Sequence, residues 1–297
     1  MLSATDQLSP TIAVGGATGE VGGRVARLLA ERGVAQRLIV RDASRAPSLP
    51  RAEVAVVGGY EDAAGMRAAL QGVDAFLLVP GHETADRVTA HRAAVQAAAE
   101  GGAGRIVQLS FAGAAPDATF TYARDHWATE QDVRASGLPW TIARMNFYLD
   151  VLPHFVLPSG DLAGPAGDGR VAAIARDDVA AALAELLVGG GHAGKAYELT
   201  GAEALTFSEI AVTMARQSGR TVTYLRETVD EAYASRAHYE ATDVEREGWV
   251  TTYTAVAAGE LAHVSSDVLQ LTGREPQTLT QWLAAHPLAL AHVDTLG

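Results

Sequence analysis

A short apolar strand that runs directly into three evenly spaced glycines is the feature that most constrains this chain. Residues 11–15 read TIAVG, and Gly16-x-x-Gly19-x-x-Gly22 follows, with an amphipathic pattern over 20–33. Glycines at this spacing let the backbone turn sharply and approach a pyrophosphate, while the start of a helix offers unpaired N–H groups. The segment therefore predicts a dinucleotide-binding loop between a strand and a helix.

Short strands alternate with helical patterns through the first 200 residues. Seven apolar runs have the length and composition of buried strands, at 11–15, 37–41, 53–58, 75–80, 105–110, 140–145 and 196–200. Such alternation is typical of βαβ units with a parallel sheet covered on both faces. We therefore predict an α/β fold with a Rossmann-type doubly wound parallel sheet.

Helix-start signals become frequent after residue 200. Thr206 with Glu209, and Thr228 with Glu231, match the capping-box spacing, and one short strand is expected at 221–225. These patterns predict a small, mostly helical C-terminal substrate lobe.

The Gly- and Pro-rich segment 158–169 is expected to be a loop that links the two parts. We predict two domains with the following ranges: an NAD(P)-binding Rossmann domain at 10–157, completed by 170–201, and the substrate lobe at 202–297 with 150–169.

The composition restricts the partners. A net charge of −12 argues against nucleic acid and anionic membranes, and no apolar run is long enough to span a bilayer. There are no cysteines, and the nine histidines show no metal-ligand spacing, so we expect no metal. The first ten residues lack the features of a signal peptide and are expected to be a short lead-in. We expect a cytoplasmic monomer or homodimer that acts on a small molecule.

The end of the second strand indicates which dinucleotide is bound. Folds that select NAD usually have an acidic side chain at this point, which binds the ribose hydroxyls. Here Arg41 ends the predicted strand, and Arg45 follows four residues later. A guanidinium suits a 2′-phosphate, so NADP(H) is favoured and NAD(H) is less expected. Asp42 leaves the alternative open, because a shift of one residue would make it a ribose ligand.

Several longer segments resemble one family. They are VRDASRA, GVDAFLLVPG, IVQLSFAGAAPDATFTYARDHWATE, ASGLPWTIARMNFYLD and GKAYELTGAEALTFSEIA. Together with the glycine spacing they are similar to the NmrA-like atypical short-chain dehydrogenases, closest to the branch of NADPH quinone oxidoreductases and triphenylmethane-dye reductases. The resemblance extends from about residue 11 to about residue 285.

The resemblance implies a set of binding residues. The implied cofactor contacts are Gly16, Thr18, Gly19, Glu20, Val21, Gly22, Arg41, Val79, Pro80, Gly81, Ser110 and Phe111. The family's Arg-x-Asn-x-Tyr pattern falls on Arg144, Asn146 and Tyr148, near the expected nicotinamide. We expect Asn146, Tyr148 and His82 to contact the substrate. Gly59 replaces an aspartate that the family often has near the adenine, which leaves the adenine contacts open.

The stretch TYARDHWATE, residues 121–130, carries the candidate catalytic side chains. Ordinary short-chain dehydrogenases use a Ser with a Tyr-x-x-x-Lys helix, and Ser110, Tyr122 and His126 occupy those places here. The only lysine is Lys195, so the Tyr-Lys pair does not exist. His126 is open to three interpretations: a proton donor, a positioning group, or a structural histidine. Tyr122 either transfers a proton or lines the cleft, and Thr129 and Glu130 are expected to serve helix packing and the surface.

A site without a strong proton donor favours electron-poor acceptors over simple ketones. We therefore predict an NADPH-dependent oxidoreductase that transfers hydride to a quinone-like or other conjugated aromatic molecule. The alanine- and arginine-rich composition is compatible with a role in natural-product metabolism. The alternative is an NAD(P)-binding redox sensor of the NmrA type with little catalysis.

Overall fold

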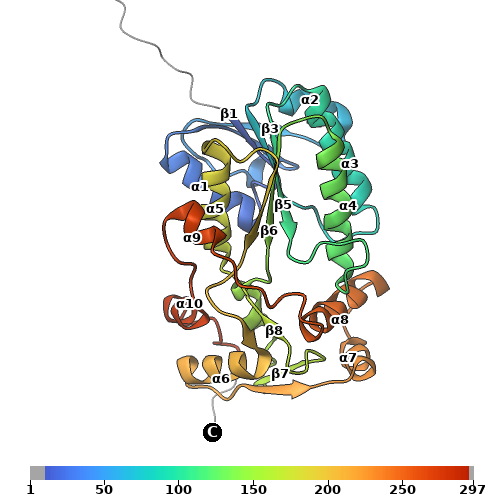
Figure 1. The fold of residues 1–297 in the computed structure, drawn as a ribbon, viewed down its shortest axis with the longest axis vertical. Coiled ribbons are helices and arrows are strands. Elements are labelled where there is room, and N and C mark those ends of the chain that lie inside the picture. Colours follow the sequence, from blue (N-terminus) through green and yellow to red (C-terminus); the bar gives the residue numbers. More distant parts are fainter. Residues whose placement is uncertain (1–10, 294–297) are drawn as a thin grey trace, which may run out of the picture.

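The seven apolar runs form one parallel sheet (Figure 1). The protein is described by a computed structural model over residues 11–293, so the expected N-terminal lead-in lies outside the described residues. The strands, in spatial order, are β3 (Ala52–Val56), β2 (Ala35–Val40), β1 (Thr11–Val14), β4 (Ala75–Leu78), β5 (Ile106–Phe111), β6 (Trp140–Met145) and β9 (Lys195–Leu199). All seven predicted strands are present, each within two residues of its expected ends, and the predicted Rossmann-type fold is confirmed.

Helices cover both faces of the sheet because strand side chains alternate. Phe76 and Leu78 of β4 point into the core beneath one group of helices, while Leu77 between them points into the core on the other face. Figure 1 shows the two groups, with α1 and α5 on one side and α2, α3 and α4 on the other. Their bounds are α1 Glu20–Glu31, α2 Ala63–Leu70, α3 Arg87–Glu100, α4 Thr121–Ala135 and α5 Arg176–Val188.

The C-terminal part is mostly helical. Its helices are α6 (Phe207–Ser218), α7 (Val229–Arg236), α8 (Asp243–Ala257), α9 (Asp267–Thr272) and α10 (Leu279–Ala285). The predicted capping boxes of α6 and α7 are confirmed, and α8 and α10 begin with the same device at Thr242 and Thr278. The domain boundaries stay a prediction, but α9 packs against α5 and β9 of the large part, beside α5 in Figure 1.

The segment expected as a linking loop contains regular structure. β7 (Asp161–Gly164) lies within it and pairs in parallel with β11 (Thr223–Arg226). The single-sequence pattern hides this strand because β7 has glycine and aspartate at its ends, and its backbone partners come from a distant segment. A second small pair joins β8 (Arg170–Val171) to β10 (Leu205–Thr206), and two 3₁₀ segments are η1 (Ala43–Arg45) and η2 (Leu149–Phe155).

The strand order places the functional loops together. β1 lies between β2 and β4, so the loops that follow these three strands meet at the carboxyl edge of the sheet. In doubly wound folds ligands bind at such a topological switch point. In Figure 1 the helices α6, α7, α8 and α10 lie at the end of the molecule toward which this edge points, and α8 contacts α4.

Candidate active site

The loop between β1 and α1 is a tight turn that only glycines permit. Gly16 has φ +64°, and the N–H of Gly19 donates to its carbonyl at 2.8 Å. A Cβ on Gly22 would lie 2.3 Å from the Gly16 oxygen, so the helix packs directly on the loop backbone. Gly16 and Gly22 therefore have the turn and helix-packing roles that the dinucleotide fingerprint requires, and close approach of a pyrophosphate at Gly19 stays a prediction.

The start of α1 fits a pyrophosphate. Its N-cap, Gly19, offers no side-chain cap, and Thr18, Gly19 and Glu20 are exposed. Val21 and Gly22 are buried, which limits their contribution to backbone N–H groups. An uncapped helix N-terminus on an exposed glycine loop leaves donors free for an anion.

Arg41 and Asp42 follow β2 and have different environments. The Asp42 carboxylate accepts from the Ser44 N–H at 2.9 Å and from the Ser44 hydroxyl at 2.7 Å, and so caps η1. These two bonds hold the pKa of Asp42 below its ordinary value. Arg41 Nη2 lies 3.1 Å from Nε2 of His82, while Arg45 ends η1. The structure therefore places His82 beside the expected cofactor residue Arg41, and its contact with substrate stays a prediction.

The loop after β4, Val79–Gly81, is held in place by two side chains that the sequence did not single out. The Tyr60 hydroxyl donates to the Val79 carbonyl at 2.6 Å, and the Gly81 N–H donates to Nε2 of His91 at 2.9 Å. Tyr60 follows β3 and also lies against Gly15, where a Cβ would be 2.4 Å from its hydroxyl. The expected cofactor segment, Val79–Gly81, is thus hydrogen-bonded to the segment after β3 and to α3.

His91 is buried and must be neutral. Its Nε2 accepts from Gly81, so the proton is on Nδ1, which faces the Thr129 hydroxyl at 3.0 Å. That hydroxyl in turn donates to the Asp125 carbonyl at 2.9 Å. Burial, and next the charge of Arg87, lower the pKa of His91 to about 3.

His126 on α4 is also a neutral, buried imidazole. A guanidinium can only donate, so Arg87 Nη2 donates to His126 Nε2 across 3.2 Å. Burial, followed by the charges of Arg87 and His91, lowers the pKa of His126 well below its ordinary value. A histidine that is already deprotonated and accepts from an arginine is a poor proton donor, which favours the positioning interpretation over the proton-transfer one.

Tyr122 packs against α8 of the C-terminal part. Its hydroxyl donates to the Val244 carbonyl at 3.3 Å. Its ring packs so closely on Gly248 that a Cβ added there would be 2.4 Å from a ring carbon. Arg87 lies over the ring, 5.5 Å from its centre. Burial, followed by the nearby Glu83 carboxylate, raises the pKa of Tyr122 to about 12. This hydroxyl thus keeps its proton and already has an acceptor.

Ser110 takes part in a buried ion-pair network. Its hydroxyl donates to Glu130 at 2.7 Å, and Arg144 binds the same carboxylate with Nε and Nη2, each at 2.8 Å. Glu130 was expected to serve packing and the surface. It is instead fully buried, because its side chain extends from α4 to Ser110 of β5 and Arg144 of β6. Phe111, the next residue, packs against Phe120 and His126. With its hydroxyl bound to Glu130, Ser110 is poorly suited to act on a substrate.

The residues after β6 have separate partners. Both polar atoms of the Asn146 amide have a partner: Nδ2 donates to the Leu261 carbonyl at 3.0 Å, and Oδ1 accepts from the Phe147 N–H at 2.7 Å. Tyr148 contacts Met145 and lies under Arg176, 5.0 Å from its ring centre. Asn146 therefore fixes the backbone of this loop to the segment after α8, and its contact with substrate stays a prediction.

Comparison with known proteins identifies the family. A family model described as NAD(P)H-binding matches residues 16–188. The NAD(P)H azoreductase of Xenophilus azovorans is 30% identical over 94% of this chain and 98% of that protein. The chain belongs to the NmrA-like atypical short-chain dehydrogenase/reductase family. It is an NAD(P)H-binding oxidoreductase.

Other relatives of this NmrA-like reductase are similar over nearly its whole length. The (4-alkanoyl-5-oxo-2,5-dihydrofuran-3-yl)methyl phosphate reductase of Streptomyces griseus is 34% identical over 94% of this chain and 99% of that protein. The structure of the Escherichia coli NADPH-dependent quinone oxidoreductase QOR2 with NADPH has a TM-score of 0.85 at 29% identity, covering 93% and 99% of the chains. The transcriptional regulator NmrA, at 19% identity and a TM-score of 0.74 over 96% and 95%, shares the fold alone.

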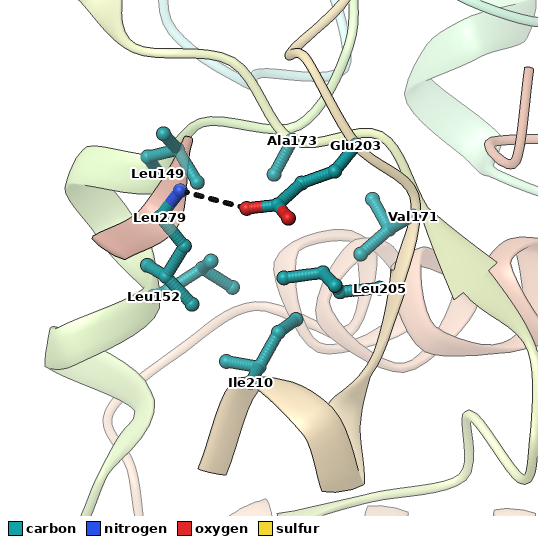
Figure 2. A pocket seen from close by; sticks show the side chains of 8 residues that line it. All are labelled: Leu149, Leu152, Val171, Ala173, Glu203, Leu205, Ile210 and Leu279. Carbon is teal, nitrogen blue, oxygen red and sulfur yellow. Dashed lines mark hydrogen bonds between the residues drawn. The ribbon is translucent and has the colours of Figure 1, made fainter. Parts of the chain in front are cut away.

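Two cavities are lined in part by residues of η2 and α10. Figure 2 shows the smaller one, about 10 Å³, where the Glu203 carboxylate points among apolar side chains and accepts from the Leu279 N–H at 3.1 Å. It has room for about one water and not for a substrate. The larger is an open hollow of about 520 Å³ beside the start of α1, lined by Glu20, Arg24, Asp150, Arg176, Trp282 and His286 among others.

The described residues, 11–293, contain neither of two further kinds of site. No group of three or more His, Asp or Glu side chains there is arranged to hold a metal ion. No helix of that range is long and apolar enough to cross a membrane.

We expect the buried His91 to make the folded protein less stable in acid. An unfolded chain binds a proton at His91 near pH 6.5, whereas the folded one resists protonation down to about pH 3, so stability is lost as pH falls between these values. We expect this residue to account for about 2 kcal/mol of the stability lost between about pH 7 and about pH 5. His91→Gln should show a smaller loss over that interval, measured as the change in urea-unfolding free energy. The exposed His238→Gln is the matched control, and an undiminished loss in His91→Gln would contradict the assignment.

Proposed function

We propose that this protein is an NADPH-dependent reductase that transfers hydride to a conjugated, electron-poor small molecule, either a quinone-like aromatic or an unsaturated carbonyl compound. The observation that carries the proposal is the absence of a free, strong proton donor among the expected catalytic groups. Ser110 donates to Glu130, and Tyr122 donates to a backbone carbonyl. His126, which stands in the place of the lysine, accepts from Arg87.

The single lysine supports this interpretation by its position. Lys195 begins β9 and pairs in register with Thr141 near the start of β6, at the amino edge of the sheet. The glycine loop lies at the opposite, carboxyl edge. A lysine therefore has no part in proton transfer at the proposed site.

The chemistry of the acceptor accounts for the missing acid. Reduction of a ketone produces a basic alkoxide, and general acid catalysis is then worth about 10²–10⁴ in rate. Reduction of a quinone or an enone produces an anion stabilised by resonance, which mainly needs orientation against the donor. NAD(P)H, when bound, supplies the hydride. The chain supplies the glycine loop and α1 for the pyrophosphate, Arg41 for the 2′-phosphate, and the loop Val79–Gly81 along the carboxyl edge.

The names of the relatives are consistent with such acceptors. They are an azoreductase, a quinone oxidoreductase and a reductase of a 2,5-dihydrofuranone that carries an alkanoyl group. In each name the acceptor is a conjugated system. The third supports extending the proposal from aromatic acceptors to unsaturated lactones and keeps a role in natural-product metabolism among the possibilities.

The test is anaerobic oxidation of NADPH at saturating cofactor against quinones, azo dyes, triphenylmethane dyes, unsaturated lactones and simple ketones, with NADH in parallel. We expect turnover with one or more conjugated classes and none with simple ketones. Tyr122→Phe should keep turnover within about tenfold, because its hydroxyl bonds a backbone carbonyl; loss by the factor of about 10²–10⁴ typical of a general acid would contradict this.

The redox-sensor alternative predicts a different result. A sensor binds NADPH and oxidises it with no member of the panel. The likeness to NmrA is one of fold, so no specific observation favours this alternative.

A further inference from the structure

His82 and Arg41 form a contact between two loops that flank the glycine loop. Arg41 follows β2 and His82 lies in the loop after β4, and these strands are the two neighbours of β1. Arg41 Nη2 and His82 Nε2 are 3.1 Å apart. The pair therefore lies at the carboxyl edge, on the side of the site where the second strand ends.

The backbone that precedes His82 is fixed. The Gly81 N–H, immediately before it, donates to the buried His91, and the Val79 carbonyl accepts from Tyr60. Both bonds come from side chains with little freedom to move, since His91 is 3% exposed and Tyr60 is wedged against Gly15. His82 is exposed, but the segment that carries it is anchored.

The pair has no acidic side chain bonded to it. The ion pairs found within residues 11–293 do not include Arg41, and the Asp42 carboxylate is turned toward Ser44. Asp42 and Arg45 neighbour Arg41 along the chain, and the Glu83 carboxylate is close enough to interact with His82. Glu83 in turn faces Arg87 of α3, Asp125 of α4 and Glu245 of α8. Two exposed nitrogen-bearing side chains thus meet here with no carboxylate of the described chain bonded to either.

We infer that His82, together with Arg41, binds the 2′-phosphate of NADPH, and that His82 takes up a proton when the phosphate binds. The inference rests on the proposed function, in which Arg41 faces that phosphate. It reassigns His82 from substrate contact to selection of the cofactor.

The donor and acceptor rules account for the proton. In the observed contact His82 Nε2 accepts from a guanidinium that cannot act as an acceptor, so this nitrogen carries no hydrogen. A phosphate oxygen only accepts, so His82 must carry a hydrogen on Nε2 to bind it. Either the neutral Nε2–H tautomer or the protonated imidazole offers this hydrogen, and the phosphate dianion favours the positively charged form. Binding of a 2′-phosphate should therefore strengthen as pH falls from about 8 to about 6.5, until the phosphate itself protonates near pH 6.

The experiment uses 2′,5′-ADP and 5′-AMP as probes, because they differ only in the 2′-phosphate and take no part in turnover. Their binding to the full chain is measured by titration calorimetry at about pH 8 and about pH 6.5, in two buffers of different ionisation enthalpy. We expect the wild type to bind 2′,5′-ADP about three- to tenfold more tightly at the lower pH, with uptake of a fraction of one proton, and 5′-AMP with neither effect. His82→Gln should lose both the proton uptake and the pH dependence.

The variants test the role of His82 separately from the preference for NADPH. His238→Gln, an exposed histidine on the C-terminal part, should behave as the wild type. If His82→Gln retains the wild-type pH dependence and proton uptake while Arg41→Ala loses affinity for 2′,5′-ADP, the role of His82 is wrong and that of Arg41 stands. If the wild type itself binds 2′,5′-ADP no more tightly than 5′-AMP, the preference for NADPH is wrong as well, whereas hydride transfer from NADH remains open.

Discussion

Gly22→Ala is expected to weaken NADPH binding by about 30- to 150-fold. The added methyl group would lie 2.3 Å from the Gly16 oxygen and 2.8 Å from the Gly15 oxygen, and both are backbone atoms of the phosphate loop. Relief of such overlap costs about 2–3 kcal/mol, and here it moves the loop away from α1. Titration of NADPH by its fluorescence would give the dissociation constant directly.

Gly190→Ala is the matched control for this change. Gly190 is an exposed glycine with negative φ, and a Cβ there would meet no atom within 4 Å, so NADPH affinity should not change. Circular dichroism should show Gly22→Ala folded. If this folded variant bound NADPH like the wild type, the glycine loop would not be the pyrophosphate site.

Glu130→Leu is expected to lower the free energy of unfolding by about 3–5 kcal/mol. The Glu130 carboxylate is fully buried and accepts from Ser110 and from two nitrogens of Arg144, so its loss leaves a half-buried guanidinium with only the more distant Glu198 at 3.2 Å. Breaking one partner of a buried pair is costly because the other charge stays desolvated. Urea unfolding followed by circular dichroism measures the change.

Two further variants show whether burial is the cause. Glu100→Leu breaks an exposed pair with Arg67 and should cost at most about 1 kcal/mol. The double variant Glu130→Leu with Arg144→Met removes both charges and should recover part of the loss. A cost for Glu130→Leu no larger than that for Glu100→Leu would show that the buried network contributes little to stability.

The sequence predicted the elements whose signals are local. The seven strands were recognisable as short apolar runs, and the capping boxes at Thr206 and Thr228 as pairs three residues apart, because each signal lies within a few neighbouring residues. β7 was missed, since its partner β11 lies about 60 residues away and the strand itself contains little apolar sequence.

The candidate site was predictable only in part. The glycine loop carries its function in its own spacing, and the structure gives Gly16 and Gly22 the backbone roles that this spacing implies. The environments of Ser110 and His126 could not be predicted, because their partners, Glu130 and Arg87, are 20 and 39 residues away. Tyr60 and His91, which hold the loop after β4, have no motif of their own.

The sequence by itself therefore determined the order of strands and helices along the chain and the place of the phosphate loop. It also determined the lack of a Tyr-Lys pair and the presence of an arginine after the second strand. These follow from residue type and spacing along the chain. Only the tertiary structure decided which charged groups are buried, which imidazoles are neutral and which loop brings His82 to Arg41. Protonation and hydrogen bonding depend on neighbours in space, and the crossover from β3 to β4, which sets β4 beside β1, brings those neighbours together from distant parts of the chain.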